Sequence, residues 1–256
     1  MKLSVVIPAY NEEESLPLTL RKLYQTLAKH GIPHEICVTN DNSKDNTLGV
    51  LEKLAATEIP TLVYYTNPGP NGFGYAVRYG LERFSGDCAA VFMADLSDDP
   101  EDLVKFYNKM LETDVDAIFG SRWGKEGKVV DYPALKKFIN RIANFIVRIL
   151  MGIRYNDTTN AFKLYKRETI EGIKPFLSPH FNLTVELPLK TIVRGYSYAV
   201  VPNSWTNRKY GHSKLKIKEM GSRYFFILMY CLIEKYFSQG DFRKKTASPV
   251  EQTVSR

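Results

Sequence analysis

An acidic stretch in the first half of the chain could hold a metal ion. It follows an apolar, strand-like run and reads Phe92-Met93-Ala94-Asp95-Leu96-Ser97-Asp98-Asp99-Pro100. Carboxylates at a strand end suit Mg²⁺ or Mn²⁺, which use one or two of them together with phosphate oxygens. Asp95 follows the strand too closely to cap the next helix, so we expect it to bind the cation, with Ser97 and Asp98 as further candidates. For Ser97, Asp98 and Asp99, capping of that helix is the alternative.

Two other polar stretches could contact a nucleotide. The first is Asn40–Thr47, in which the Asp41 carboxylate could accept hydrogen bonds from ribose hydroxyls or a base edge, whereas Asp45 is placed to cap a helix. The second is Asn71–Gly80, whose glycines fail the dinucleotide fingerprint because position 77 is Val and a loop precedes the motif. Its glycines could still let a sugar nucleotide approach the backbone.

Cationic side chains follow in the second half of the chain. Arg122 stands in Gly120-Ser121-Arg122-Trp123, and a basic segment runs from Arg208 to Lys214. Arginine suits bidentate phosphate binding, and lysine acts as a point charge. These residues therefore predict an anion site, although a solvated basic loop is the alternative for the segment from Arg208.

The elements that must position these residues alternate between strands and helices up to residue 120. Such alternation predicts an α/β fold with a mostly parallel sheet covered on both faces, and ligands bind such sheets at the carboxyl ends of the strands. The expected strands are 3–7, 35–39, 61–65, 89–93, 117–120 and, later, 198–202. The expected helices are 11–29, 45–56, 73–84, 100–111, 133–155 and 220–237.

The two late helices are the most apolar. The helix expected over 133–155 carries an apolar stripe at helical spacing with cationic flanks, and residues 224–233 form the longest apolar run. Such a stripe fits either a helix lying in a membrane surface or a helix packed on the core. We expect a catalytic domain over 1–215, a C-terminal amphipathic helix over 216–239 and a disordered segment over 240–256.

Charge is distributed unevenly along the 256 residues. The net charge of +7 combines a first part, 1–120, with 10 basic and 18 acidic residues, and a second part, 121–256, with 25 basic and 10 acidic residues. This asymmetry favours an anionic partner for the second part. The scattered basic residues form no recognisable nucleic-acid module, so we expect no nucleic-acid partner.

The compartment can also be inferred. The three cysteines, Cys37, Cys88 and Cys231, have no metal-ligand spacing, which favours a reducing compartment. We expect neither an export signal nor a membrane span, because the apolar runs are shorter than the roughly 20 residues needed to cross a bilayer.

Taken together and in order, the motifs resemble those of the family 2 glycosyltransferases of GT-A fold, and in particular the dolichol- or polyprenyl-phosphate mannosyl- and glucosyltransferases. The resemblance covers residues 2 to about 215. The matching segments are Val5–Glu12, Asn40–Ser43, Asn71–Gly74, Asp157–Lys163 and Arg208–Lys214. The main departure lies at the family's Asp-x-Asp metal motif, which here is Met93-Ala94-Asp95, and a thioether is a poor ligand for a hard cation.

The resemblance implies roles for particular residues. A nucleoside-diphosphate sugar, GDP- or UDP-linked, would contact Pro8, Tyr10, Asn11, Glu12, Asp41, Gly74, Ala94 and Asp95. Mg²⁺ or Mn²⁺ would bind at Asp95, with Ser97 and Asp98 as further ligands. Arg208, with Arg122, would offset the charge of the leaving diphosphate, and Arg122, Arg208, Ser213 and Lys214 would bind phosphate or acceptor.

The acceptor decides whether a catalytic base is needed. A polyprenyl phosphate is largely an anion at pH 7 and needs no strong base. A hydroxyl acceptor would need one, and Asp157 and Glu186 are the candidates. A sugar-nucleotide binding protein without transferase activity is a further alternative. With a lipid acceptor we expect peripheral contact with the cytoplasmic face of a membrane, or a homo-oligomer that buries the two apolar helices.

Overall fold

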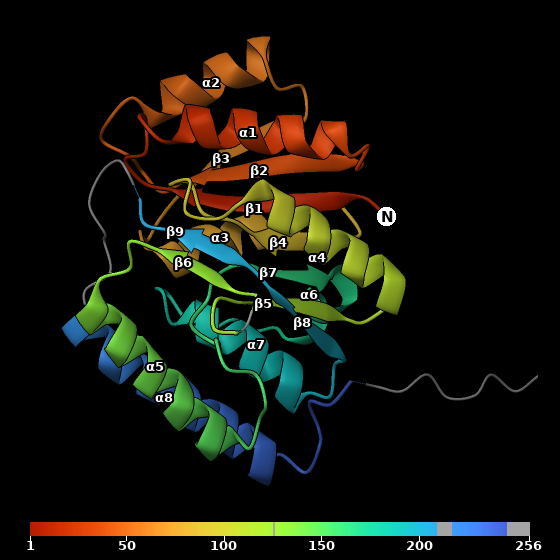
Figure 1. Ribbon diagram of the computed structural model, residues 1–256, viewed down its shortest axis with the longest axis vertical. Coiled ribbons are helices and arrows are strands. Elements are labelled where there is room, and N and C mark those ends of the chain that lie inside the picture. Colours follow the sequence, from red (N-terminus) through yellow and green to blue (C-terminus); the bar gives the residue numbers. More distant parts are fainter. Residues whose placement is uncertain (125, 209–216, 245–256) are drawn as a thin grey trace, which may run out of the picture.

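The computed structural model describes residues 1–124, 126–208 and 217–244 (Figure 1). Its strands are β1 (Leu3–Ala9), β2 (His34–Asn40), β3 (Leu62–Thr66), β4 (Cys88–Val91), β5 (Ala117–Ser121), β6 (Lys128–Val130), β7 (Lys163–Lys166), β8 (Tyr198–Pro202) and β9 (Ser204–Thr206). Its helices are α1 (Leu16–Lys29), α2 (Thr47–Thr57), α3 (Phe73–Leu81), α4 (Pro100–Thr113), α5 (Ala134–Met151), α6 (Arg167–Gly172), α7 (Leu183–Val193) and α8 (Ile217–Phe237).

The central sheet has seven strands in the order β3-β2-β1-β4-β7-β5-β8. Only β7 is antiparallel to its neighbours, β4 and β5, so the predicted mostly parallel α/β sheet is confirmed. The chain winds outward from β1 to β3 and then returns to place β4 on the other side of β1. The carboxyl ends of β1 and β4 therefore meet at a switch point, where open α/β sheets bind ligands.

Helices cover both faces of this sheet. The first core joins alternate side chains of β1 to the apolar faces of α1, α2 and α4. The second core lies on the opposite face, between the sheet and α3, α6 and α7. Parallel strands buried on both faces read as continuous apolar runs, which is why β1 was visible in the sequence.

Two predicted helix starts differ from the observed ones. The sequence predicted a capping box at Asn11, but α1 begins at Leu16 after Ser15, whose side chain makes no capping bond. The Asn11 side chain instead accepts a hydrogen bond from the Lys44 backbone N–H, at 2.7 Å. Asp45 lies one residue earlier than a capping position, although its carboxylate still accepts from the backbone N–H of Thr47.

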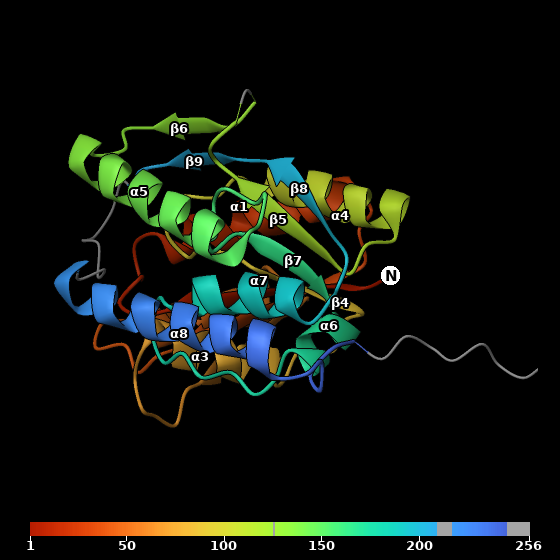
Figure 2. The same cartoon turned by 90° about the horizontal axis from the view of Figure 1, so that it is seen from below.

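The late helices α5 and α8 lie at the end of the molecule opposite α1 and α2 (Figure 1), and Figure 2 shows both of them on the side that faces the viewer. They share a third core with α7, in which Val147 and Met151 meet Ile227, Leu228 and Cys231. Most of their apolar surface nevertheless faces outward. The exposed residues are Leu135, Phe138, Ile139, Ile142, Phe145, Ile146, Ile149 and Leu150 in α5, and Phe225, Phe226, Met229, Ile233, Tyr236 and Phe237 in α8.

The exposure of the apolar stripe excludes one of the two predictions for α5, namely that this stripe packs on the protein core. The residues that α5 buries are Asn144, Val147 and Met151, none of which belongs to the exposed apolar stripe, so this stripe is not packed on the protein core. In the part of the chain that the structure describes, no helix is both long and apolar enough to cross a membrane.

The segment after α8 returns to the body of the protein. Lys244 pairs with Asp116 at 2.8 Å, and its backbone N–H donates to the carbonyl of Arg194. Disorder predicted for residues 240–244 is therefore wrong, while residues 245–256 lie outside the described residues. Arg194 and Glu234 form a buried pair that ties α7 to α8, so α8 packs as part of the same fold.

Candidate functional site

A cavity of about 370 Å³ opens at the carboxyl ends of β1 and β2; we call it the strand-end cavity. Five of the predicted site residues line it, namely Pro8, Tyr10, Glu12, Asp41 and Arg208. They come from segments up to 200 residues apart, which the parallel strands bring together at one edge. The predicted cluster at this edge of the sheet is thus present in the fold.

Asp41 organises one wall of this cavity. Its carboxylate accepts hydrogen bonds from the Asn67 side chain at 2.7 Å and from the Gly72 backbone N–H at 2.8 Å. It therefore fixes the turn that leads from β3 into α3.

Four predicted nucleotide contacts do not line the strand-end cavity, namely Asn11, Gly74, Ala94 and Asp95, of which Asp95 lines a neighbouring cavity described below. Asn11 joins the loop after β1 to the loop after β2, because its backbone N–H donates to Ser43. Ala94 is buried and its carbonyl accepts from Thr19. Gly74 lies under the backbone of residues 178–180, where a Cβ would collide with the Ser178 carbonyl, so a glycine is needed there for packing.

A charged pair joins the acidic stretch to the basic segment. The Arg208 guanidinium donates to the Asp95 carboxylate at 2.6 Å and lies 3.7 Å from the Glu12 carboxylate. All three side chains are largely buried. The structure thus brings together residues that follow β1, β4 and β9. Ser213 and Lys214, the other predicted phosphate ligands, lie outside the described residues.

The donor set at Asp95 fits a hard cation only in part. Asp95 and Ser97 offer a carboxylate and a hydroxyl, whereas Met93 offers a thioether. Among the described residues, no group of three or more His, Cys, Asp or Glu could hold a metal by itself. Because Mg²⁺ is usually held by one or two carboxylates plus substrate phosphates, the residues present fit a cation that arrives with a diphosphate.

Asp98 is a buried carboxyl beside Asp95. Burial, followed by the charge of Asp95, raises the pKa of Asp98 to about 7, although its carboxylate accepts a hydrogen bond from the Met93 backbone N–H. Asp98 is not the cap of the helix that follows, α4, because the N-terminal cap of that helix is Asp99.

A second cavity, of about 420 Å³, lies between α5 and α8; we call it the helix cavity. It adjoins the strand-end cavity, since Met93, Phe181 and Arg208 line both. Among the described residues, its charged lining consists of the cations Arg122, Lys136 and Arg208 and the acidic residues Asp95 and Asp98. Its apolar wall includes Ile139, Ile146, Tyr224, Phe225 and Leu228.

The cations of the helix cavity raise the local positive potential. The pKa of Lys136 is lowered by burial and then by the nearby charges of Arg208 and Arg122, while Asp95 acts in the opposite direction. Arg122 and Arg208 already pair with carboxylates, whereas an anion bound beside Lys136 would favour its charged form, as Asp95 does. Lys136 was not among the predicted site residues, because in sequence it is one of several lysines flanking the apolar stripe.

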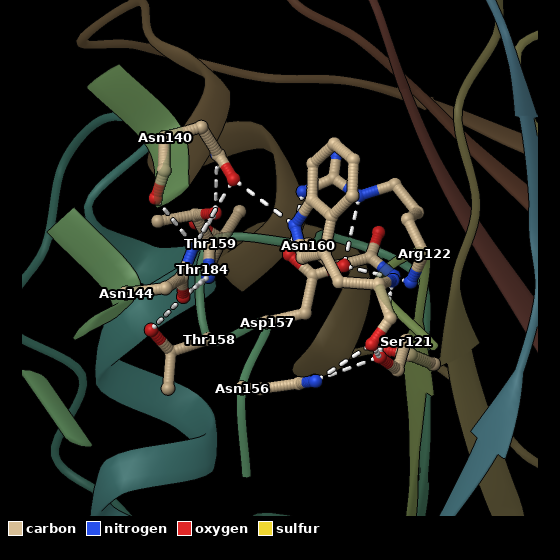
Figure 3. A network of polar contacts seen from close by, with 12 residues as sticks. Ser121, Arg122, Asn140, Asn144, Asn156, Asp157, Thr158, Thr159, Asn160 and Thr184 are labelled. Carbon is tan, nitrogen blue, oxygen red and sulfur yellow. Dashed lines mark hydrogen bonds and ion pairs between the residues drawn. The ribbon is translucent and has the colours of Figure 1, made fainter. Parts of the chain in front are cut away.

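Asp157 is paired with Arg122 beneath the helix cavity (Figure 3). Its carboxylate accepts from the Arg122 Nη2 at 2.7 Å, and from the Nε and the backbone N–H at 2.9 Å each. The Asp157 side chain is fully buried and lines neither cavity. The geometry therefore favours orientation of Arg122 over the predicted role as a catalytic base.

Glu186, the other candidate base, is also held within the fold. Its carboxylate accepts from the backbone N–H groups of Leu177 and Ser178 at 2.7 Å each, and it pairs with buried Lys190 at 2.6 Å. Like Asp157, it is fully buried and lines neither cavity. These contacts tie residues 177–178 to the first turns of α7, so they favour a structural role over that of a catalytic base.

An aromatic pair lies where the two cavities adjoin. Phe73 and Phe181 are stacked with ring centroids 4.3 Å apart, and Phe181 contributes to both cavities. Neither residue was predicted, although the unusual aromatic residue at position 73, between two glycines, was a visible signal.

The family of the chain follows from comparison with known proteins. The model of the family "Glycosyl transferase family 2" matches residues 4–173. The chain therefore belongs to glycosyl transferase family 2, and the protein is a glycosyltransferase, as the motifs predicted.

Individual relatives show which members of the family this chain is similar to. An undecaprenyl-phosphate mannosyltransferase of Micrococcus luteus is 30% identical over 221 residues, covering 84% of this chain and 88% of the relative. A dolichol-phosphate mannosyltransferase of Pyrococcus furiosus is 34% identical over 85% of this chain, which spans 60% of the length of that relative. A polyprenol monophosphomannose synthase of Mycolicibacterium smegmatis is 30% identical, covering 82% of this chain and 80% of the relative.

Solved structures confirm the GT-A fold. Glucosyl-3-phosphoglycerate synthase from Mycobacterium tuberculosis, in complex with Mn²⁺, uridine diphosphate and phosphoglyceric acid, superimposes with a TM-score of 0.68 at 19% identity. The match covers 90% of this chain and 78% of that one. At this identity the likeness extends to the fold alone.

Proposed function

We propose that the enzyme transfers a hexose from a nucleoside-diphosphate sugar to a polyprenyl (dolichyl) phosphate. The observation that carries this proposal is the helix cavity, which combines the cations Arg122, Lys136 and Arg208 with an apolar wall formed by α5 and α8. A ligand that matches it has an anionic head and an apolar tail. The relatives named as undecaprenyl-phosphate and dolichol-phosphate mannosyltransferases support the same class of acceptor.

The donor would bind in the strand-end cavity, with its diphosphate directed toward Arg208. Asp41, Pro8 and Tyr10 would contact the nucleoside. The same cavity suits either a GDP- or a UDP-linked sugar, and Arg208, which lines both cavities, would offset charge on the leaving diphosphate.

A divalent cation is part of the proposal. Asp95, with Ser97, would hold Mg²⁺ or Mn²⁺, which would neutralise part of the diphosphate charge when bound. Isothermal titration of a nucleoside diphosphate with and without Mn²⁺ tests this directly. Equal affinity in both conditions would remove the cation from the proposal.

The chemistry requires no protein base with this acceptor. A phosphate monoester has a second pKa of about 6, so near pH 7 it is largely ionised. One of its oxygens would attack the anomeric carbon as the bond to the nucleoside diphosphate breaks, with inversion. Arg122 and Lys136 would orient the attacking phosphate, which agrees with the burial of Asp157 and Glu186 away from both cavities.

Membrane contact follows from the position of the helix cavity. The exposed apolar faces of α5 and α8 border it, and basic residues such as Lys137, Arg141 and Arg148 flank them. This pattern suits an interfacial surface, with the basic residues near anionic lipids of a cytoplasmic leaflet. A second copy of the chain is the alternative cover for this surface, and sedimentation at several concentrations would reveal it.

The decisive experiment offers the purified protein radiolabelled GDP- and UDP-hexoses with a polyprenyl phosphate. We expect label to enter the lipid phase with one donor, in a reaction that depends on the acceptor phosphate. The matching polyprenyl alcohol is the control for a hydroxyl acceptor. Transfer to the alcohol but not to the phosphate would overturn the proposed acceptor, and donor binding without any transfer would favour a binding protein.

A further inference from the structure

α5 is held to the rest of the protein at its centre by a polar network (Figure 3). Asn144, the one polar residue among the three that α5 buries, accepts a hydrogen bond from the Thr158 hydroxyl at 2.7 Å. Its amide also donates to the Thr159 hydroxyl at 3.0 Å. Asn140, one turn earlier, donates to the same Thr159 hydroxyl at 2.7 Å.

The far side of this network reaches Arg122. Thr158 and Thr159 directly follow Asp157, whose carboxylate holds the Arg122 guanidinium at 2.7 Å. A second connection runs through Trp123, whose indole N–H donates to the Asn140 side chain at 3.2 Å. The loop over 156–160 is thus bonded on one side to α5 and on the other to the segment after β5.

Two cations of the helix cavity lie on these two elements. Arg122 follows β5, whereas Lys136 lies on α5, one turn before Asn140. Their separation is therefore set by how α5 is placed against the loop over 156–160. The outer face of α5 near Asn144 is exposed, so at this point the polar contacts that α5 makes with the protein are the hydrogen bonds of the network.

We propose that Asn144, Thr158 and Thr159 are positioning residues for the acceptor, which hold Arg122 and Lys136 at the separation that one phosphate headgroup requires. The inference rests on the proposed function, since it assigns the headgroup to this cavity. The network touches no part of the strand-end cavity, so donor binding is independent of it. It also predicts that α5, although largely exposed, cannot shift without altering the acceptor site.

The test uses Thr158→Val, which removes one hydroxyl and keeps the shape of the side chain. Thr169→Val is the matched control, because Thr169 is also fully buried and donates a single hydrogen bond, to the Asp116 carbonyl at 3.0 Å, in the helix that follows β7. KM for a polyprenyl phosphate, KM for the donor, kcat and the melting temperature are measured for both variants and for Asn144→Ala.

We expect Thr158→Val to raise the acceptor KM about tenfold, an effect of about 1.4 kcal/mol, with donor KM and kcat within about twofold of the wild type. Thr169→Val should lower the melting temperature similarly and leave the acceptor KM unchanged. The double variant Asn144→Ala/Thr158→Val should have an acceptor KM no higher than that of Asn144→Ala alone, because the two residues share one bond.

Equal acceptor KM in Thr158→Val and Thr169→Val would overturn the inference, provided that the wild type transfers sugar to a polyprenyl phosphate. A wild type that transfers no sugar to any polyprenyl phosphate would instead overturn the proposed function, and the inference with it.

Discussion

Asp157 binds Arg122 through both of its carboxylate oxygens, at 2.7 and 2.9 Å, in a fully buried position. This bidentate pair fixes the orientation of the guanidinium and places its charge in the wall of the helix cavity. From sequence alone the same carboxylate is, with Glu186, a candidate base for a hydroxyl acceptor. Its hydrogen bonds instead indicate that it orients Arg122, which binds the acceptor phosphate in the proposed function.

The first prediction concerns Asp157→Asn. The variant leaves a buried guanidinium without its counter-charge, so we expect a free energy of unfolding lower by about 3 kcal/mol and an acceptor KM raised about tenfold or more. Thermal or urea unfolding and initial rates measure the two effects.

The double variant Arg122→Gln/Asp157→Asn is the control for the charge. It should be more stable than Asp157→Asn, since it contains no unpaired buried charge.

The pH–rate profile distinguishes a catalytic base at Asp157 from a residue that positions Arg122. A base would contribute the acidic limb of that profile, so disappearance of this limb in Asp157→Asn would contradict a positioning role.

The second prediction concerns Lys136. Its pKa is lowered by burial and by Arg208 and Arg122, so its charge is lost at a lower pH than that of an ordinary lysine. Since the protonated form binds the anion, acceptor affinity should decrease as the pH rises through this lowered pKa. Lys136→Arg should extend binding to higher pH, because arginine remains charged. Lys136→Met should raise the acceptor KM at every pH, and Lys137→Met, at the exposed neighbouring position, should not. An unchanged alkaline limb in Lys136→Arg would count against this assignment.

The sequence predicted the sheet and its ligand edge because these depend on local patterns. Strands buried on both faces read as apolar runs, and the polar residues after them stand out. The α7 helix was missed because it is buried all round, including Glu186 and Lys190, and contains Pro188, so it has no amphipathic period. The short antiparallel β7 was missed because its four residues give too little alternation to identify a strand.

The direction of the α5 apolar face could not be predicted either. Periodicity identifies an apolar stripe but does not say what covers it. The inward position of Asn144 depends on Thr158 and Thr159, which belong to another element, and on their hydroxyl groups as partners. The same dependence on a distant partner explains why Asp157 resembled a base, since Arg122 becomes its ion-pair partner only in the fold. Lys190, the partner of Glu186, is only four residues away in sequence, but the two pair as neighbours on α7, a helix that was not predicted.

The third prediction concerns the exposed surface of α5 and α8. Phe138 and Phe226 are 64% and 60% exposed, and neither lines the helix cavity. Because burying a phenylalanine contributes about 1.5–3 kcal/mol, Phe138→Ser/Phe226→Ser should weaken binding to anionic vesicles at least about tenfold. Leu111→Ser, at a 53% exposed position on α4, is the control and should bind vesicles normally. Vesicle flotation measures this binding, and equal binding by all three proteins would exclude this surface as the membrane contact.

The fourth prediction concerns acid stability, at the end of the sheet opposite the cavities. Burial acts to raise the pKa of Glu35, but hydrogen bonds from Ser4, Ser85 and Lys2 outweigh it and lower the pKa from 4.5 to about 2. The folded state thus binds this proton more weakly than the unfolded state. The stabilisation is fully present above about pH 4.5 and is lost as the pH falls toward 2.

Glu35→Gln should therefore be less stable than the wild type at pH 7, and the difference should shrink progressively below pH 4.5. Urea unfolding at several pH values between 7 and 3 measures it. Glu112→Gln, at an exposed position on α4, is the control and should follow the wild-type pH dependence. A constant stability difference between Glu35→Gln and the wild type over this range would show that the Glu35 carboxylate is not held in its charged form by Ser4, Ser85 and Lys2.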